Sequence, residues 1–245
     1  ALPLLAGSRS LVTGSQASTT LSSECLPLML AIAMVVVGLL FKLGAVPFHM
    51  WVPDVYDGSA TSTTLYLSAV PKLAAFAILL RLLFSGLGDW IEIWQDMLAV
   101  AAVLSIALGN VVAIAQTSIK RMLAYSTISN MGFLLLGFFA GTAAGYSAAM
   151  AYAVIYMVAT LAVFGVILAL TRPGFESDLL DDFRGLNERN PWLAFLMLTV
   201  MFSLAGIPPT AGFFAKLMVL QAALGSGFIE IVVVAAILAV VGAFY

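Results

Sequence analysis

Three lysines lie in long uncharged stretches of the sequence, where a charged side chain is costly. They are Lys42, Lys72 and Lys216. A lysine at the centre of a membrane helix costs about 2.5–3.5 kcal/mol, so such residues usually face a bundle interior or a water-filled cavity. Snorkelling to the interface is the alternative, but for Lys72 the interface is about 15 Å away, too far for one side chain. An amine removed from water gives up its proton more readily, so the pattern indicates proton transfer.

Two of these lysines lie beside residues that interrupt helices. Gly44 and Pro47 follow Lys42, and Gly206-Ile207-Pro208-Pro209 precedes Lys216. Proline cannot donate a backbone hydrogen bond, so each helix should break there, and the freed carbonyls of the first break should point at the Lys42 ammonium. Paired interrupted spans are typical of the internal repeat of a transporter. Simple packing kinks are the alternative.

Other polar residues inside the apolar runs extend this candidate site. His49 follows the first break and is of a residue type that can pass protons near neutral pH, although a lone histidine is often only structural. A polar cluster within one later run consists of Ser126, Thr127, Ser129 and Asn130. Its members either bond to neighbouring helices or line a chain of waters. Tyr152, Tyr156 and Thr160 are spaced at four and should share one helix face, where aromatic packing is the simpler explanation.

The composition excludes an ordinary soluble enzyme. Of the 245 residues, 63% are apolar and only 9% are charged, whereas soluble domains carry about 25% charged residues. The mean hydropathy is +1.12, which predicts an all-α polytopic membrane protein in contact with the lipid bilayer. The net charge of −2 and the lack of a basic block give no indication of nucleic acid. With Cys25 as the only cysteine, a thiolate zinc site and an iron–sulfur cluster are excluded.

The apolar runs fit seven crossings, two of them broken. We place them at 26–57 (broken), 61–85, 97–116, 121–140, 147–171, 191–224 (broken) and 228–245. Residues 1–25 are interpreted as the end of a preceding helix and a loop, and the chain as a fragment of a longer protein. Basic residues mark two connections as cytoplasmic, one with Lys120 and Arg121, the other with Arg172, Arg184 and Arg189. The second connection is either a short amphipathic surface helix or a solvated linker.

Four sequence segments resemble one known family. They are Phe41-Lys42-Leu43-Gly44-Ala45-Val46-Pro47-Phe48-His49 with the following Trp51-Val52-Pro53-Asp54-Val55-Tyr56-Asp57-Gly58, Ser68-Ala69-Val70-Pro71-Lys72, Gln116-Thr117-Ser118-Ile119-Lys120-Arg121, and Ser203-Leu204-Ala205-Gly206-Ile207-Pro208-Pro209 continuing to Lys216. Together they resemble the antiporter-like subunits of the proton-pumping NADH:quinone oxidoreductase, respiratory complex I. The Asp54-Val55-Tyr56 version is similar to the subunit N (subunit 2) branch. The sequence departs from the family at 59–64, where prolines are common, and at Asn130, where many members have histidine.

The resemblance implies a fold of about fourteen helices in two inverted repeats. Residues 26–140 would be the end of the first repeat and the start of the second, and 141–245 the rest of the second, truncated. It implies Lys42 and Lys216 as broken-helix lysines, Lys72 as the central lysine, and a glutamate partner of Lys42 that this sequence lacks. It also implies a multi-pass location in a bacterial inner membrane or its organelle equivalent, with other membrane-arm subunits as partners.

The sequence therefore leads to the hypothesis of a lateral proton relay. Its members are Lys42, Lys72, Lys216 and His49, with Ser126, Ser129, Asn130 and Tyr156 as further candidates. We expect no cofactor or metal in this chain, so NADH, FMN, iron–sulfur clusters and quinone belong to other subunits of the translocase. The alternative is a subunit of a multi-subunit cation/proton antiporter. A passive scaffold is disfavoured, because it would gain stability by losing the three lysines.

Overall fold

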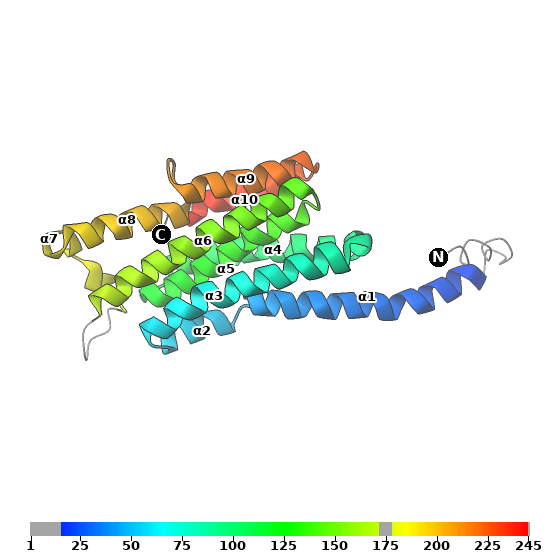
Figure 1. Ribbon diagram of the computed structural model, residues 1–245, viewed down its shortest axis with the longest axis horizontal. Helices are drawn as coiled ribbons and strands as arrows, with labels where there is room; N and C mark the ends of the chain where they lie inside the picture. Colours follow the sequence, from blue (N-terminus) through cyan, green and yellow to red (C-terminus); the bar gives the residue numbers. More distant parts are fainter. Residues whose placement is uncertain (1–15, 172–177, 245) are drawn as a thin grey trace.

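The computed structural model describes residues 16–171 and 178–244, and side chains from residue 26 onward. Within these ranges the chain is helical, with a single isolated β-bridge between Ser118 and Leu179. The helices lie side by side along one long axis (Figure 1). They are α1 (Gln16–Leu43), α2 (Trp51–Gly58), α3 (Thr61–Leu80), α4 (Ile91–Ile114), α5 (Ile119–Phe139), α6 (Ala143–Leu170), α7 (Leu186–Arg189), α8 (Pro191–Ala205), α9 (Ala211–Gly225) and α10 (Ile229–Gly242), with short turns η1 (Arg81–Gly86), η2 (Gly88–Trp90) and η3 (Leu180–Phe183).

The predicted all-α polytopic membrane fold is confirmed. Five helical segments are long and apolar enough to cross a membrane, and three shorter apolar helices, α8, α9 and α10, complete the bundle. Two predicted crossings begin at the wrong residue: α1 begins at Gln16 rather than at residue 26, and α4 begins at Ile91 rather than at residue 97. Glu92 lies in its first turn, where the positive end of the helix dipole favours a carboxylate.

Two predicted crossings are indeed broken. The first passes from α1 to α2 through residues 44–50, and the second from α8 to α9 through residues 206–210. In Figure 1 the halves of each broken helix follow one another along the long axis, and the two broken helices run in opposite directions. The glycine and proline residues therefore interrupt each helix without turning the chain back.

Helix α5 forms the centre of the bundle. It packs against α2, α4, α6 and α9. Of its most apolar stretch of 18 residues, 94% is buried inside the protein. It is also the crossing that carries the polar cluster Ser126, Thr127, Ser129 and Asn130. Surrounding protein supplies the hydrogen-bond partners that lipid lacks, which explains why this helix, rather than a lipid-facing one, is central.

The loops that connect the helices lie at two opposite ends of the bundle, as expected for helices that cross a membrane. At one end the backbone N–H of Ile119 donates to the carbonyl of Asp178 (2.9 Å), and the N–H of Leu180 donates to Thr117 (3.1 Å), so the two basic connections lie together. At the other end Gln95 bonds to Phe139 (2.7 Å) and Ser226 to Ala140 (2.9 Å). The predicted sidedness of the membrane remains a prediction.

The second basic connection does not form one amphipathic helix within the described residues. Residues 180–183 form a 3-10 turn and 186–189 a single helical turn. Gly185 between them has a φ of 69°, a left-handed conformation that ends a regular helix. The exposed Arg184 and Arg189 therefore belong to a linker, the alternative interpretation, and Arg172 and Glu176 lie outside the described residues.

Candidate functional site

The first break places a buried lysine at the end of a helix. Lys72, in the middle of α3, is only 4% exposed. Its ammonium donates to the carbonyl of Leu43, the last residue of α1, and lies 5.0 Å from the ring centre of Trp51 in α2. The carbonyls at a helix C-terminus carry partial negative charge. Lys72 is thus held by the negative end of the first half-helix and by an aromatic face.

The prediction that the freed carbonyls would point at Lys42 was wrong. Lys42 lies in the last turn of α1, and in the described part of the chain its side chain is exposed. Side chains of a helix tilt towards its N-terminus, whereas its last carbonyls face the C-terminal end, so a lysine in the last turn is poorly placed to reach them. A lysine from another helix, Lys72, takes that position instead. His49 lies half-buried in the segment between α1 and α2.

The second break repeats the arrangement with a lysine from its own second half. Lys216 of α9 is half-buried, and its Nζ donates to the carbonyls of Leu204 (3.0 Å) and Ala205 (2.8 Å) at the end of α8. The ammonium lies 5.1 Å from the ring centre of Phe133 in α5. Ser203 links the two halves of the broken helix, because its hydroxyl in α8 accepts from the backbone N–H of Gly212 in α9 (3.1 Å).

The polar cluster of α5 bonds across to α6. The amide of Asn130 donates to the carbonyl of Ser126 (2.8 Å), and its oxygen accepts from the hydroxyl of Tyr152 (2.6 Å). One turn away, the hydroxyl of Tyr156 donates to Thr127 (2.8 Å). The predicted common face of Tyr152, Tyr156 and Thr160 is therefore confirmed, and it faces the cluster. Ser129 is also buried.

Tyr156 lines two small cavities. One of about 10 Å³ is lined by Lys216, Asn130, Tyr152 and Tyr156, among others. The other, also about 10 Å³, is lined by Tyr156, Ser126, Thr127 and Thr160 and by apolar neighbours. A polar cavity of this size is close to the minimum that holds one water molecule. Lys216 and Asn130 are thus neighbours around one water-sized space, whereas Ser126 and Thr127 line the other.

Sequence reasoning missed one buried cation. Lys120, interpreted as a loop charge, is 1% exposed and forms an ion pair with Asp178 (2.8 Å). Ser118 caps α5 by accepting from the N–H of Arg121 (3.4 Å), which places Lys120 in the first helical turn. The Ser118 cap was the available sequence signal, but the contact with Asp178 joins segments 58 positions apart.

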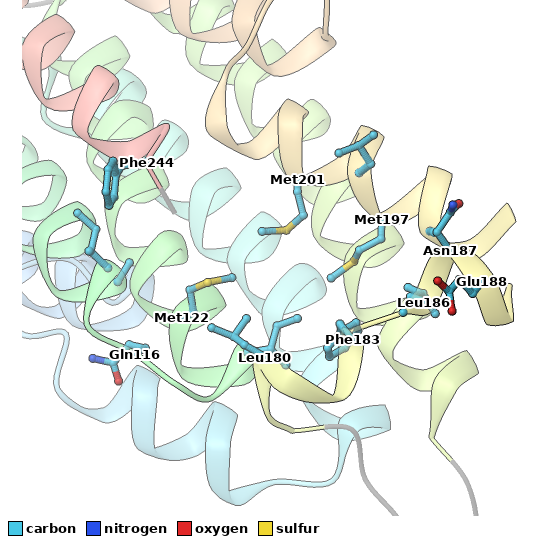
Figure 2. A pocket seen from close by; sticks show the side chains of 16 residues that line it. Gln116, Met122, Leu180, Phe183, Leu186, Asn187, Glu188, Met197, Met201 and Phe244 are labelled. Carbon is cyan, nitrogen blue, oxygen red and sulfur yellow. The ribbon is translucent and has the colours of Figure 1, made fainter. Parts of the chain in front are cut away.

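A larger cavity lies apart from the lysines. Its volume is about 740 Å³, and it lies between the start of α5, α8 and the linker of residues 180–188. Figure 2 shows Met197 and Met201 of α8 on one side and Met122 of α5 and Phe183 on the other. None of the three candidate relay lysines lines it, so it is not part of the candidate site.

Fold and site together define a class of protein: a polytopic helical membrane protein with two broken helices, each ending at a lysine ammonium. The chain belongs to the family of NADH:quinone oxidoreductase/Mrp antiporter transmembrane proteins, whose model matches residues 5–242. It is a multi-pass protein of this transmembrane family, and the bacterial relatives below imply a location in the inner membrane.

Curated relatives sharpen the assignment within the family. The chain is 60% identical over 219 residues to NADH-quinone oxidoreductase subunit N of Thioalkalivibrio sulfidiphilus, covering 89% of this chain and 46% of that protein. It is 59% identical over 220 residues to the subunit N of Thiobacillus denitrificans, covering 90% and 46%. The predicted resemblance to subunit N is confirmed. The chain spans about half the length of these relatives.

Solved structures show the same fold. Respiratory complex I from Thermus thermophilus with bound aureothin contains a chain that matches with a TM-score of 0.77 and 35% identity, covering 89% of this chain and 47% of that one. A chain of the Mrp complex from Dietzia matches with a TM-score of 0.80 and 28% identity, covering 87% and 40%. The antiporter-like architecture is therefore shared between complex I and Mrp assemblies.

Proposed function

We propose that the full-length protein is a proton-translocating subunit of the membrane arm of NADH:quinone oxidoreductase. One observation carries the proposal: Lys72 and Lys216 are held at the free carbonyl ends of two broken helices. Among the described residues no carboxylate forms an ion pair with either lysine. Each amine therefore contacts groups that stabilise its charge without a permanent counter-ion, which suits a site that gains and loses a proton.

In the proposed relay, each lysine accepts a proton on Nζ and later donates it to a neighbouring hydroxyl or water. Around Lys216 the carriers are Asn130, Tyr152 and Tyr156, which line the shared cavity, with Ser126 and Thr127 beyond Tyr156. Ser129 is a further buried polar group on α5. At the first break the proposed carriers are Lys72, His49 and Lys42, the last of which is exposed.

The redox chemistry is assigned to other subunits. The proposal makes NADH, FMN, iron–sulfur clusters and quinone the property of the partners in the complex, and leaves this chain without a cofactor. Movement of one charge changes the electrostatic potential at the next lysine, which couples proton transfer to events elsewhere in the arm. The opposite directions of the two broken helices (Figure 1) support the proposed inverted repeats.

A cation/proton antiporter subunit is the second candidate, favoured by the match to the Mrp complex. The 60% identity with a subunit N supports the first candidate instead. The two are distinguished in inverted membrane vesicles. Proton transport driven by NADH oxidation is expected for the first, and sodium transport without NADH for the second.

The relay is tested with Lys72→Met in the assembled complex reconstituted into vesicles. Methionine is close to lysine in length but carries no titratable proton, so proton pumping should be lost. Arg81→Met is the matched control, because it removes an exposed positive charge from the turn that directly follows α3 and should leave pumping intact. Undiminished pumping by the Lys72→Met complex would overturn the assignment.

A further inference from the structure

Both broken helices end in the same backbone motif. In α1 the N–H of Gly44 donates to Phe41 (3.0 Å) and the N–H of Ala45 to Leu40 (2.9 Å). In α8 the N–H of Gly206 donates to Ser203 (3.2 Å) and the N–H of Ile207 to Phe202 (3.0 Å). This is the Schellman motif, which closes a helix on a left-handed residue. The φ angles of 77° at Gly44 and 84° at Gly206 agree with it.

The motif leaves the last carbonyls of each helix without a backbone partner. These are the groups that the lysines contact: Leu43 accepts from Lys72, and Leu204 and Ala205 accept from Lys216. The carbonyl immediately before the glycine is an acceptor in both breaks. Each lysine must therefore approach the helix end directly beside the glycine.

The missing side chain of the glycine provides the room for that approach. A Cβ atom on Gly206 would lie 2.8 Å from Cδ, 3.2 Å from Nζ and 3.3 Å from Cε of Lys216, and these are the nearest atoms around it. A Cβ atom on Gly44 would lie 3.0 Å from Nζ of Lys72 and would also collide with the side chain of Val52. Contacts of this length force a neighbour to move.

We propose that Gly206 and Gly44 are positioning residues, which seat the lysine ammonium against the free carbonyls at the ends of α8 and α1. Glycine is required at each break for two separate reasons. It adopts the left-handed backbone, and it leaves the volume that the lysine side chain fills. The position of each ammonium against these carbonyls, called the seat below, is a structural claim. Its consequence for proton transfer rests on the proposed function.

Gly206→Ala is the sharper of the two tests. The three atoms nearest to its added methyl group all belong to the flexible side chain of Lys216, so the protein can fold while the ammonium moves away from Leu204 and Ala205. Proton pumping by the reconstituted full complex should then fall by about tenfold, as expected when a charged group loses a hydrogen bond. A cryo-EM map of the variant complex should show Lys216 displaced from both carbonyls.

Gly227→Ala is the matched control. Gly227 follows the same helix α9 and has a φ of 89°, and a Cβ atom added to it would meet no atom within 4 Å. It therefore carries the same backbone penalty without touching a lysine, and pumping should stay close to that of the unmodified complex. An equal loss in both variants would overturn the link between the position of the ammonium and pumping, because backbone strain alone would then explain the loss.

The two claims fail separately. If Lys216→Met pumps normally, the proposed function of Lys216 is wrong, but the map of Gly206→Ala still tests the seat. If the map shows Lys216 unmoved with both carbonyl contacts intact, the seat is wrong, whatever the pumping rate. A displaced lysine together with reduced pumping supports both.

Discussion

Two regions of this molecule bury a lysine in different ways. At the start of α5, Lys120 is 1% exposed and lies 2.8 Å from the carboxylate of Asp178. At the first break Lys72 is 4% exposed, nearly the same burial, yet it contacts a backbone carbonyl and an aromatic ring. Burial is therefore similar in the two regions, and the difference lies in the partner.

A carboxylate and a carbonyl hold an ammonium in different ways. The carboxylate of Asp178 carries a full negative charge, so loss of the proton from Lys120 would leave that charge without its counter-ion. A carbonyl is neutral, so Lys72 and Lys216 can alternate between charged and neutral forms without leaving a charge behind. In the proposed relay the two lysines held by backbone carbonyls exchange protons, whereas the ion pair of Lys120 ties two segments together.

The largest expected effect comes from removing the carboxylate beside Lys120. Asp178→Asn leaves a buried ammonium without a counter-ion, and breaking a buried pair in this way typically costs about 3–5 kcal/mol. Because Asp178 is itself 41% exposed, we expect roughly 2–3 kcal/mol. Thermal unfolding of the full-length subunit in detergent measures it.

Asp181→Asn in the same linker is the control for that prediction. Both side chains of its ion pair with Arg184 (3.1 Å) are exposed. The change in unfolding free energy should therefore stay below about 1 kcal/mol. Equal destabilisation by the two variants would show that Lys120 does not depend on Asp178.

The next largest effect on stability concerns the backbone of the first break and leaves its lysine unchanged. The buried N–H of Val46 donates to the hydroxyl of Ser105 in α4 (2.8 Å), and Ser105→Ala leaves this N–H without an acceptor. We expect a loss of about 1–2 kcal/mol of unfolding free energy, measured by the same thermal method. Ser147→Ala removes an exposed hydroxyl that bonds only within its own helix and should cause no loss; a loss as large as that of Ser105→Ala would contradict the prediction.

A smaller effect is expected between α5 and α6. Tyr152→Phe removes the hydroxyl that donates to Asn130 (2.6 Å), at an expected cost of about 1 kcal/mol. In the proposed relay it also slows proton pumping, which is measured in reconstituted vesicles. Tyr66→Phe, on an exposed tyrosine of α3, should change neither quantity. Normal pumping by Tyr152→Phe would remove this hydroxyl from the relay.

The smallest effect on stability belongs to the lysines at the breaks. Replacing a buried charge by an apolar side chain of similar length is often neutral or stabilising. Lys72→Met and Lys216→Met should therefore leave the unfolding free energy within about 1 kcal/mol or raise it, even though pumping is lost. Destabilisation as large as that of Asp178→Asn would break the comparison, because it would make these lysines structural.

The sequence alone predicted much of the fold and part of the site. The helical class, the positions of both breaks and the common face of Tyr152 and Tyr156 depend on local properties: apolar length, proline and glycine sterics, and helical periodicity. The start of α4 was missed because acidic residues were taken as loop residues, although Glu92 suits a helix N-terminus.

What the sequence determined is where each helix breaks and which lysines are costly to bury, because both follow from neighbouring residues. Only the tertiary structure decided which lysine meets which carbonyl. Lys72 reaches Leu43 across 29 positions, and Lys120 meets Asp178 in another segment. Such contacts depend on how distant helices pack, because a side chain in the last turn of a helix tilts towards the start of that helix and leaves the terminal carbonyls to a side chain from another element.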